Sequence, residues 1–332
     1  MFKKILTVLI VVVVLIAVVG LILPRHALVQ RSVTINRPPS LIYATVNSFV
    51  LFPKWSPWQD LDPNMHQTTQ GPRDGVGAKL VWSGNDKVGK GTEVITAATP
   101  NESMASDLDF GDMGTAKSLV TLTPDGNATR ATWAVDMDMG ANPIGHYIGL
   151  TMDRMIGKDF ATGLDKLKTL VEGMPNTDIA GFSAQPVELT ATPIVVVSES
   201  APLDAIAKAY GDGFAQIGKF MVKNKLHQAG APLGIDGEMA AGTLKFDAGI
   251  PVDRGDVAGA DAVRVAQSYA GKALKTTHVG AYEKLPQTHE KLNAYIAAHG
   301  YAQRGPIFSW YVDDPGKTPV EKLRTEIYMP ID

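Results

Sequence analysis

An unbroken apolar run opens the chain, and segments of alternating apolar and polar residues follow it. Residues 5–23, ILTVLIVVVVLIAVVGLIL, carry no charge and are long enough to cross a bilayer as a helix. A cleaved signal peptide usually has a shorter apolar region and a small-x-small site, and PRHALVQ, which follows the run, offers no such site. Two lysines precede the run and two arginines follow it. Because positive charges favour the cytoplasmic side, this distribution favours a cytoplasmic N-terminus only slightly. We expect residues 1–28 to be a single-pass membrane anchor, with the bulk of the chain on the periplasmic side.

The next region, residues 29–172, shows the pattern of an antiparallel sheet closed by a helix. Runs such as AKLVW, SLVTLT and TRATWAV are separated by the turn signals GPRDG, GND and PDGN. Apolar residues then recur at helical spacing until Gly173 and Pro175 supply a stop. The apolar positions of this expected helix are Ile148, Met152, Ile156, Phe160, Leu164, Leu167 and Val171.

The rest of the chain reads as a linker followed by a duplicated domain. Residues 173–186, GMPNTDIAGFSAQP, have the composition of an interdomain linker. Within residues 187–332, KFDAGIPVD (245–253) aligns without gaps onto RTEIYMPID (324–332). Each half reads as strand, helix and two strands, and two such halves can pair around a pseudo-twofold axis with a cleft between their helices. The overall fold class is therefore α+β.

The last strand carries a carboxylate in an otherwise apolar pattern. Period-two alternation places Glu326 and Tyr328 on one face, and Ile327 and Met329 on the other face. On this pattern alone, Glu326 is an ordinary carboxylate that faces water.

Composition and motifs exclude several functions. The formal net charge is −3 and no basic stripe is present, so nucleic acid is not expected as a partner. The chain has no cysteine, no GxSxG and no HExxH motif, and its 7 histidines are dispersed. We therefore expect no metal site, no cofactor and no classical catalytic triad.

Three motifs near the C-terminus make the second domain resemble the GyrI-like family, the effector-binding domain of AraC-type and MerR-type regulators. They are THVGAYEKLPQTHEKLNAYIAAHGY (277–301), PIFSWYVDDP (306–315) and TEIYMPI (325–331). In that family the glutamate of the last strand meets the positive charge of lipophilic cations in an aromatic-lined cleft, and Glu326 is the matching position. No helix-turn-helix segment is evident between the anchor and this domain, which argues against transcriptional regulation.

The first domain is similar to the polyketide cyclase/dehydrase branch of the SRPBCC, or START-like, superfamily. The matching stretches include VTINRPPSLIYATVNSFVLFPKWSPWQDLDP (33–63) and ATRATWAVDMDMG (128–140). The resemblance implies a helix-grip fold, in which an antiparallel sheet wraps a long C-terminal helix around an apolar cavity. It implies no particular reaction. Trp55 and Trp58 of WSPW are expected to support the core or the cavity mouth.

The candidate ligand-binding residues all lie in the second domain. Aromatic faces attract organic cations, and the repeat could bring several aromatic side chains near the carboxylate. The candidates are Glu326, Tyr282, Phe308, Trp310, Tyr328 and His278. Core packing is the alternative for the aromatic residues, and a structural hydrogen bond is the alternative for His278.

These observations predict a membrane-anchored binder of hydrophobic or cationic small molecules, with a GyrI-like cleft and a START-like cavity. Two alternatives stay open. One is a hydrolase or cyclase acting on lipophilic small molecules, with Glu326 as general base and Tyr282 as hydrogen-bond donor. The other is a non-catalytic module that grips a protein partner.

Overall fold

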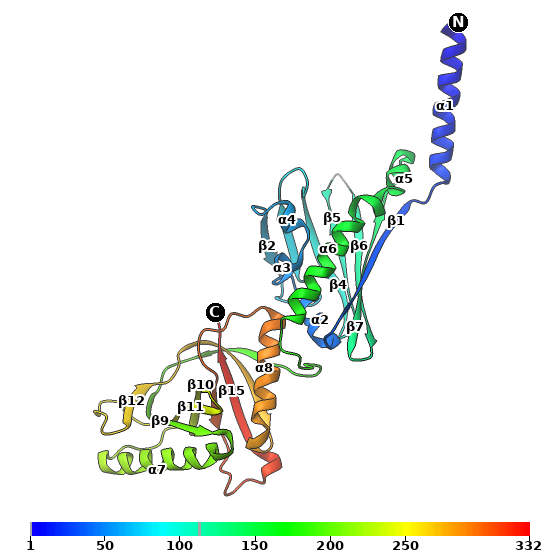
Figure 1. Cartoon of the computed structure of the whole chain (residues 1–332). Helices are drawn as coiled ribbons and strands as arrows, with labels where there is room; N and C mark the ends of the chain where they lie inside the picture. The colour runs from blue at the N-terminus through cyan, green and yellow to red at the C-terminus, as the bar shows by residue number, and fades with distance from the viewer. Residues whose placement is uncertain (1, 112–113) are drawn as a thin grey trace. The chain divides into compact units, whose positions relative to one another are not determined.

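The computed structural model describes residues 2–111 and 114–332, which fall into two compact units. Unit 1 contains Met1–Ala180 with Ala297–Gly300, and unit 2 contains Gly181–Ile296 with Tyr301–Asp332. Each unit is built on an antiparallel sheet with helices, so the predicted α+β class is confirmed (Figure 1).

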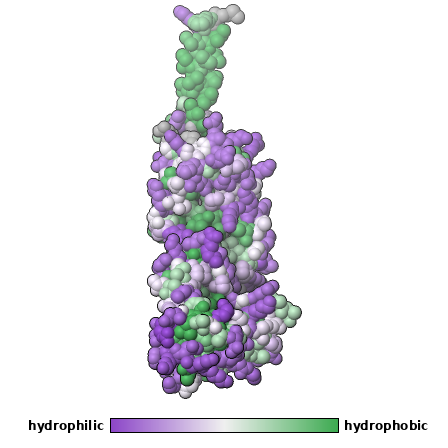
Figure 2. Space-filling model, turned by 90° about the vertical axis from the view of Figure 1, so that its left-hand side faces the viewer, coloured by the Kyte–Doolittle hydropathy of each residue, from purple (hydrophilic) through white to green (hydrophobic). Residues whose placement is uncertain are grey.

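Unit 1 begins with the apolar helix α1 (Phe2–Ile22), which is long and apolar enough to cross a membrane, although a signal sequence would meet the same criterion. Figure 2 shows an apolar surface over α1. The strands that follow pair antiparallel in the order β1-β7-β6-β5-β4-β3-β2. Their bounds are β1 (His26–Ile35), β2 (His66–Gln70), β3 (Lys79–Ser83), β4 (Lys90–Thr99), β5 (Ser103–Asp109), β6 (Thr115–Asp125) and β7 (Ala128–Asp138).

The long helix α6 (Met152–Glu172) packs along this sheet (Figure 1). Its buried side is the apolar stripe from Phe160 to Val171, and Gly163 lets the helix approach closely, because a Cβ there would lie 3.0 Å from Pro57 and Trp133. The prediction that the stripe begins at Ile148 was wrong. Ile148 lies on the separate helix α5 (Pro143–Gly149) and its side chain is exposed.

Short helices connect β1 to β2. They are α2 (Pro39–Val46), α3 (Phe52–Trp55) and α4 (Trp58–Leu61). Trp58 packs against Trp133 and Phe160, with ring centroids 5.7 and 6.1 Å away. Trp58 therefore belongs to the aromatic core between the sheet and α6.

Unit 2 confirms the predicted duplication. The first half is β9 (Pro193–Pro202), α7 (Ile206–Asn224), β10 (Leu233–Ala240) and β11 (Thr243–Pro251). The second half is β13 (Gly271–Val279), α8 (Leu285–His299), β14 (Phe308–Tyr311) and β15 (Arg324–Pro330). The strand order is β12-β9-β11-β10-β14-β15-β13-β8, so the β10–β14 pair joins the halves; β8 (Gln185–Leu189) and β12 (Val263–Gln267) lie outside the repeat.

The sheet of unit 2 has two distinct faces. On the helix face, Ile217 of α7 packs with Val195 and Ile250, and Leu292 of α8 packs with Ile327 and Met329. The opposite face carries a second set of apolar contacts around Phe308, Trp310 and Tyr328. We call it the Glu326 face, because alternation along β15 places Glu326 beside Tyr328.

Candidate functional site

Glu326 is held by two hydrogen-bond donors on the Glu326 face. Lys275 Nζ of β13 donates to Oε1 at 2.7 Å, and the Tyr328 hydroxyl donates to Oε2 at 2.6 Å. The Glu326 side chain is 30% exposed and that of Lys275 is 32% exposed. The carboxylate is therefore paired, but it remains within reach of solvent.

Aromatic rings surround this carboxylate. Phe308 and Tyr328 pair across β14 and β15 and stack with ring centroids 5.1 Å apart and an interplanar angle of 5°. Trp310 pairs directly with Glu326, and Tyr269 packs against Phe308 at 5.9 Å. Lys275 Nζ lies 5.6 Å from the centre of the Tyr328 ring, within cation–π range.

The surroundings of Glu326 favour its ionised form. Partial burial is the largest single influence and pushes its pKa up, but the hydrogen bonds from Lys275 and Tyr328 and the positive charges of Lys275 and Arg324 together bring the pKa below its ordinary value. Burial and the bond to Glu326 in turn raise the pKa of Tyr328. The site thus combines a fixed negative charge with aromatic faces, a chemistry that suits an organic cation.

Two sequence-predicted residues lie on the other side of the sheet. Tyr282, in the short 3-10 helix Tyr282–Lys284, packs against the core under α8, with its ring 5.4 Å from Tyr311. His278 is buried; its Nδ1 lies 2.8 Å from the Thr288 hydroxyl and its Nε2 lies 3.1 Å from a backbone oxygen. The structure therefore does not bring Tyr282 and His278 together with Glu326, although the sequence predicted it. Alternation along β13 turns His278 toward α8.

A cluster of polar groups on the helix face was missed from the sequence. Asp236 of β10 and His289 of α8 approach to 3.4 Å, and burial raises the pKa of Asp236 to about 6 while it lowers that of His289 to about 4. Tyr210 of α7 and Tyr311 lie next to each other, with ring centroids 5.7 Å apart. Only the pairing of the two halves brings these residues together, so no local pattern could have indicated them.

Asp247 is the repeat partner of Glu326, as the alignment of the two halves predicted, but its surroundings differ. Its carboxylate pairs with Arg264 at 2.9 Å and accepts a hydrogen bond from Ser198 at 2.6 Å. The aromatic stack beside Glu326 comes from β14 and β15. Each half of the repeat therefore carries an acidic residue paired with a basic residue at the equivalent position. The stack of Phe308 and Tyr328 belongs to the second half.

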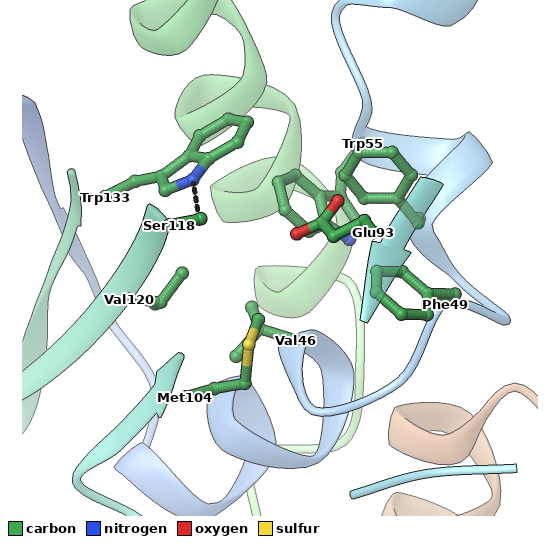
Figure 3. A pocket seen from close by; sticks show the side chains of 9 residues that line it. Val46, Phe49, Trp55, Glu93, Met104, Ser118, Val120 and Trp133 are labelled. Atoms are coloured by element: carbon green, nitrogen blue, oxygen red, sulfur yellow. Dashed lines mark hydrogen bonds between the residues drawn. The ribbon is translucent and has the colours of Figure 1, made fainter. Parts of the chain in front are cut away.

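Unit 1 contains a small cavity between its sheet and its short helices (Figure 3). The volume open to the centre of a water molecule is about 10 Å³, close to the minimum for one water. Its lining is Val46, Phe49, Phe52, Trp55, Glu93, Met104, Ser118, Val120 and Trp133. The resemblance implied an apolar cavity between the sheet and the long helix α6, but none of the lining residues of this void comes from α6.

Glu93 is the unexpected member of this lining. It is 8% exposed, its Oε1 accepts a hydrogen bond from the Ser106 hydroxyl at 2.5 Å, and burial raises its pKa to about 7. Period-two alternation along GTEVI places Glu93 on the same face as the buried Ile95, so a sequence signal existed. Because lone charged residues on strands usually face water, this pattern was not interpreted as a buried glutamate.

Two family models match the chain, one after the other. Residues 26–172 match a family model described as polyketide cyclase/dehydrase and lipid transport, and residues 185–332 match one described as a GyrI-like small molecule binding domain. No protein of curated function matches the chain.

Three solved structures resemble parts of the chain. The EcmrR C-terminal domain is 17% identical with a TM-score of 0.41, covering 45% of this chain and 97% of that chain. SAV2435 bound to tetraphenylphosphonium is 23% identical with a TM-score of 0.34, covering 46% and 94%. A hydrolase from Listeria innocua is 15% identical with a TM-score of 0.33, covering 45% and 92%. These likenesses are too distant to carry an argument about ligand or activity. From the family models, the chain consists of a START-like domain of the polyketide cyclase/dehydrase type followed by a GyrI-like domain, with an N-terminal helix that is a candidate membrane anchor.

Proposed function

We propose that this protein binds a lipophilic organic cation on the Glu326 face of its GyrI-like domain, beside a membrane to which α1 anchors it from the periplasmic side. The family described for this domain is one of small-molecule binders. The observation that carries the cation is the pairing of Glu326 with an ammonium group next to an aromatic ring, since Lys275 Nζ contacts both Glu326 and the Tyr328 ring.

Lys275 acts in this proposal as a built-in substitute for the ligand. Both partners of its ion pair are about one-third exposed, and ion pairs at such exposure contribute only about 0 to 1 kcal/mol. An incoming cation can therefore displace the ammonium at little cost and take its place on Glu326. Contact with the partly exposed ring of Trp310 adds an attraction that the small lysine head group does not use, while Phe308 and Tyr328 are buried against each other.

The membrane side of the proposal rests on α1 and its neighbour α5. The Tyr147 hydroxyl donates to the backbone oxygen of Ile16 at 2.8 Å, and Gly20 is buried where a Cβ would collide with Pro143. Beside these contacts, α5 and the residue after it leave Ile144 and Leu150 more than 60% exposed. Large apolar side chains next to an apolar helix suit the headgroup region of a bilayer.

The hydrolase alternative required Glu326 and Tyr282 to act on the same substrate. Glu326 and Tyr282 lie on opposite faces of the sheet, and general-base catalysis requires both groups within hydrogen-bond reach of one substrate. Binding of a cation requires only the Glu326 face.

The test is calorimetry of the full chain in detergent micelles with benzyltrimethylammonium as the probe. We expect saturable binding that weakens at least about tenfold in Glu326→Gln, because two opposite unit charges about 4 Å apart near a protein surface attract by roughly 4 kcal/mol. Asp247→Asn is the matched control, since it removes the repeat partner's charge, and it should bind like the unmodified chain. Equal affinity in the Glu326→Gln and Asp247→Asn variants would refute the proposal, as would the absence of binding in the unmodified chain.

A further inference from the structure

The Glu326 face carries a second carboxylate, that of Asp247 on β11. Alternation turns Asp247 away from the helix face, on which its neighbour Ala248 is buried. Directly across the sheet, Asp247 pairs with Ile235 of β10, which packs with Phe308 on the Glu326 face. The two equivalent acids of the repeat therefore point to the same side of the sheet.

Two rows of directly paired residues cross this face from β11 to β15. One row is Asp247, Ile235, Phe308 and Tyr328, and the other is Gly249, Leu233, Trp310 and Glu326. The two acids thus stand at opposite ends of neighbouring rows, as the repeat requires. Three strand spacings and a shift of two residues along the strands separate their Cα atoms by about 16 Å.

The direct line between the two acids passes over an apolar strip formed by Ile235 and Trp310. Ile235 lies next to Asp247 in one row, and Trp310 lies next to Glu326 in the other row. Both side chains belong to one apolar cluster and are partly exposed, whereas the other two central side chains of the rows are buried. An apolar chain laid from one acid to the other would therefore contact this strip.

Each acid is already matched by one basic side chain. Lys275 Nζ lies 2.7 Å from Glu326 Oε1, and Arg264 Nη2 lies 2.9 Å from Asp247 Oδ2. The exposed fractions of these four side chains run from 29% for Asp247 to 54% for Arg264. Ion pairs at such exposure are weak, so an external cation can displace either base. The face thus offers a position for a positive group at either end of the apolar strip.

We propose that the Glu326 face binds a dication, a molecule in which an apolar spacer joins two organic cations. One cation pairs with Glu326 beside the aromatic rings, the other pairs with Asp247, and the spacer lies over the apolar strip. Two linked contacts hold a ligand more tightly than either contact alone when the spacer matches their separation. Because the contact with Glu326 is the one proposed above for a single cation, this ligand class rests on the proposed function.

The test is calorimetry of the full chain in detergent micelles with decamethonium, in which a long polymethylene spacer joins two trimethylammonium groups. Asp247→Asn should weaken decamethonium binding roughly fivefold, because it removes one of two ion pairs. It should leave the affinity for benzyltrimethylammonium unchanged, since a single cation engages Glu326 beside the aromatic stack. Glu326→Gln should weaken the binding of both probes.

The analogue of decamethonium with an ethylene spacer is the matched control. It carries the same two charges but is too short to reach both acids, so Asp247→Asn should change its affinity less than twofold. An equal loss for both dications would indicate a general charge effect and would overturn the proposal. A decamethonium affinity that Asp247→Asn leaves unchanged would overturn it as well.

Failure of the dication differs from failure of the proposed function. In the first case benzyltrimethylammonium still binds and still depends on Glu326, whereas in the second case Glu326→Gln leaves its affinity unchanged. Circular dichroism of both variants establishes that they fold.

Discussion

Two glutamates with almost the same local sequence have pKa values shifted in opposite directions. Thr92-Glu93-Val94 lies on β4, and Thr325-Glu326-Ile327 lies on β15. Both carboxyl groups lie among aromatic rings, but Glu326 receives hydrogen bonds from an ammonium and a phenol, whereas Glu93 receives one from a serine. The pKa of Glu326 lies below its ordinary value and that of Glu93 rises to about 7. The partners of a carboxyl group, and not the strand pattern around it, therefore decide which ligand charge it suits.

The largest expected effect concerns the stability of the first domain. A folded-state pKa of about 7, above the ordinary 4.5, means that the folded domain holds the Glu93 proton more tightly than the unfolded chain. The resulting stabilisation is complete below pH 4.5 and is lost as the pH rises through about 7, with a size of roughly 3 kcal/mol. Glu93→Gln should remove this pH dependence.

Urea unfolding followed by tryptophan fluorescence measures that effect. The Trp310→Phe background leaves tryptophans only in the first domain, so the signal reports that domain alone. An unchanged pH dependence in Glu93→Gln would show that Glu93 is not the group whose pKa is raised.

A smaller effect is expected from removing Lys275, the lysine that pairs with the Glu326 carboxylate. Lys275→Met removes the competing ammonium and keeps a side chain of similar length, so the affinity for benzyltrimethylammonium should rise about two- to fivefold. Lys272→Met changes the net charge equally at an exposed position of the same strand. A similar gain in both variants would indicate a general charge effect and would remove Lys275 from the site.

Alternation and repetition in the sequence were enough to predict the two-domain fold, the duplication and the face that carries Glu326. They could not identify Lys275, because its contact with Glu326 depends on how β13 pairs with β15. Tyr282 and His278 were grouped with Glu326 although they lie on the other side of the sheet: alternation along β13 turns His278 toward α8, and Tyr282 comes after the chain reversal that follows β13. Glu93 was hidden by the expectation that a lone acid on a strand faces water.

The proposed membrane contact of α5 can be tested independently of any ligand. The chain has no cysteine, so Ile148→Cys provides a single labelling position for an environment-sensitive dye. In vesicles containing the full chain, we expect a blue shift and quenching by a lipid-borne quencher. Asn127→Cys, in the exposed β6–β7 turn, should show neither effect, and identical behaviour of the two labels would contradict a membrane-facing α5.

The smallest expected effect is that of Tyr282. Because its ring packs on the helix face against Tyr311, Tyr282→Phe should change the affinity for benzyltrimethylammonium less than twofold. A loss as large as that in Glu326→Gln would place Tyr282 in the cation site after all and would revive the expected pairing of the two residues.

The most direct test of the contrast between the two glutamates is an infrared spectrum of the full chain labelled with ¹³C-glutamate, recorded at pH 6. We predict a protonated carboxyl band that disappears in Glu93→Gln and remains in Glu326→Gln. A band that survives in Glu93→Gln, or one that disappears in Glu326→Gln, would contradict the assignment of a neutral acid to the first domain and an ionised acid to the second.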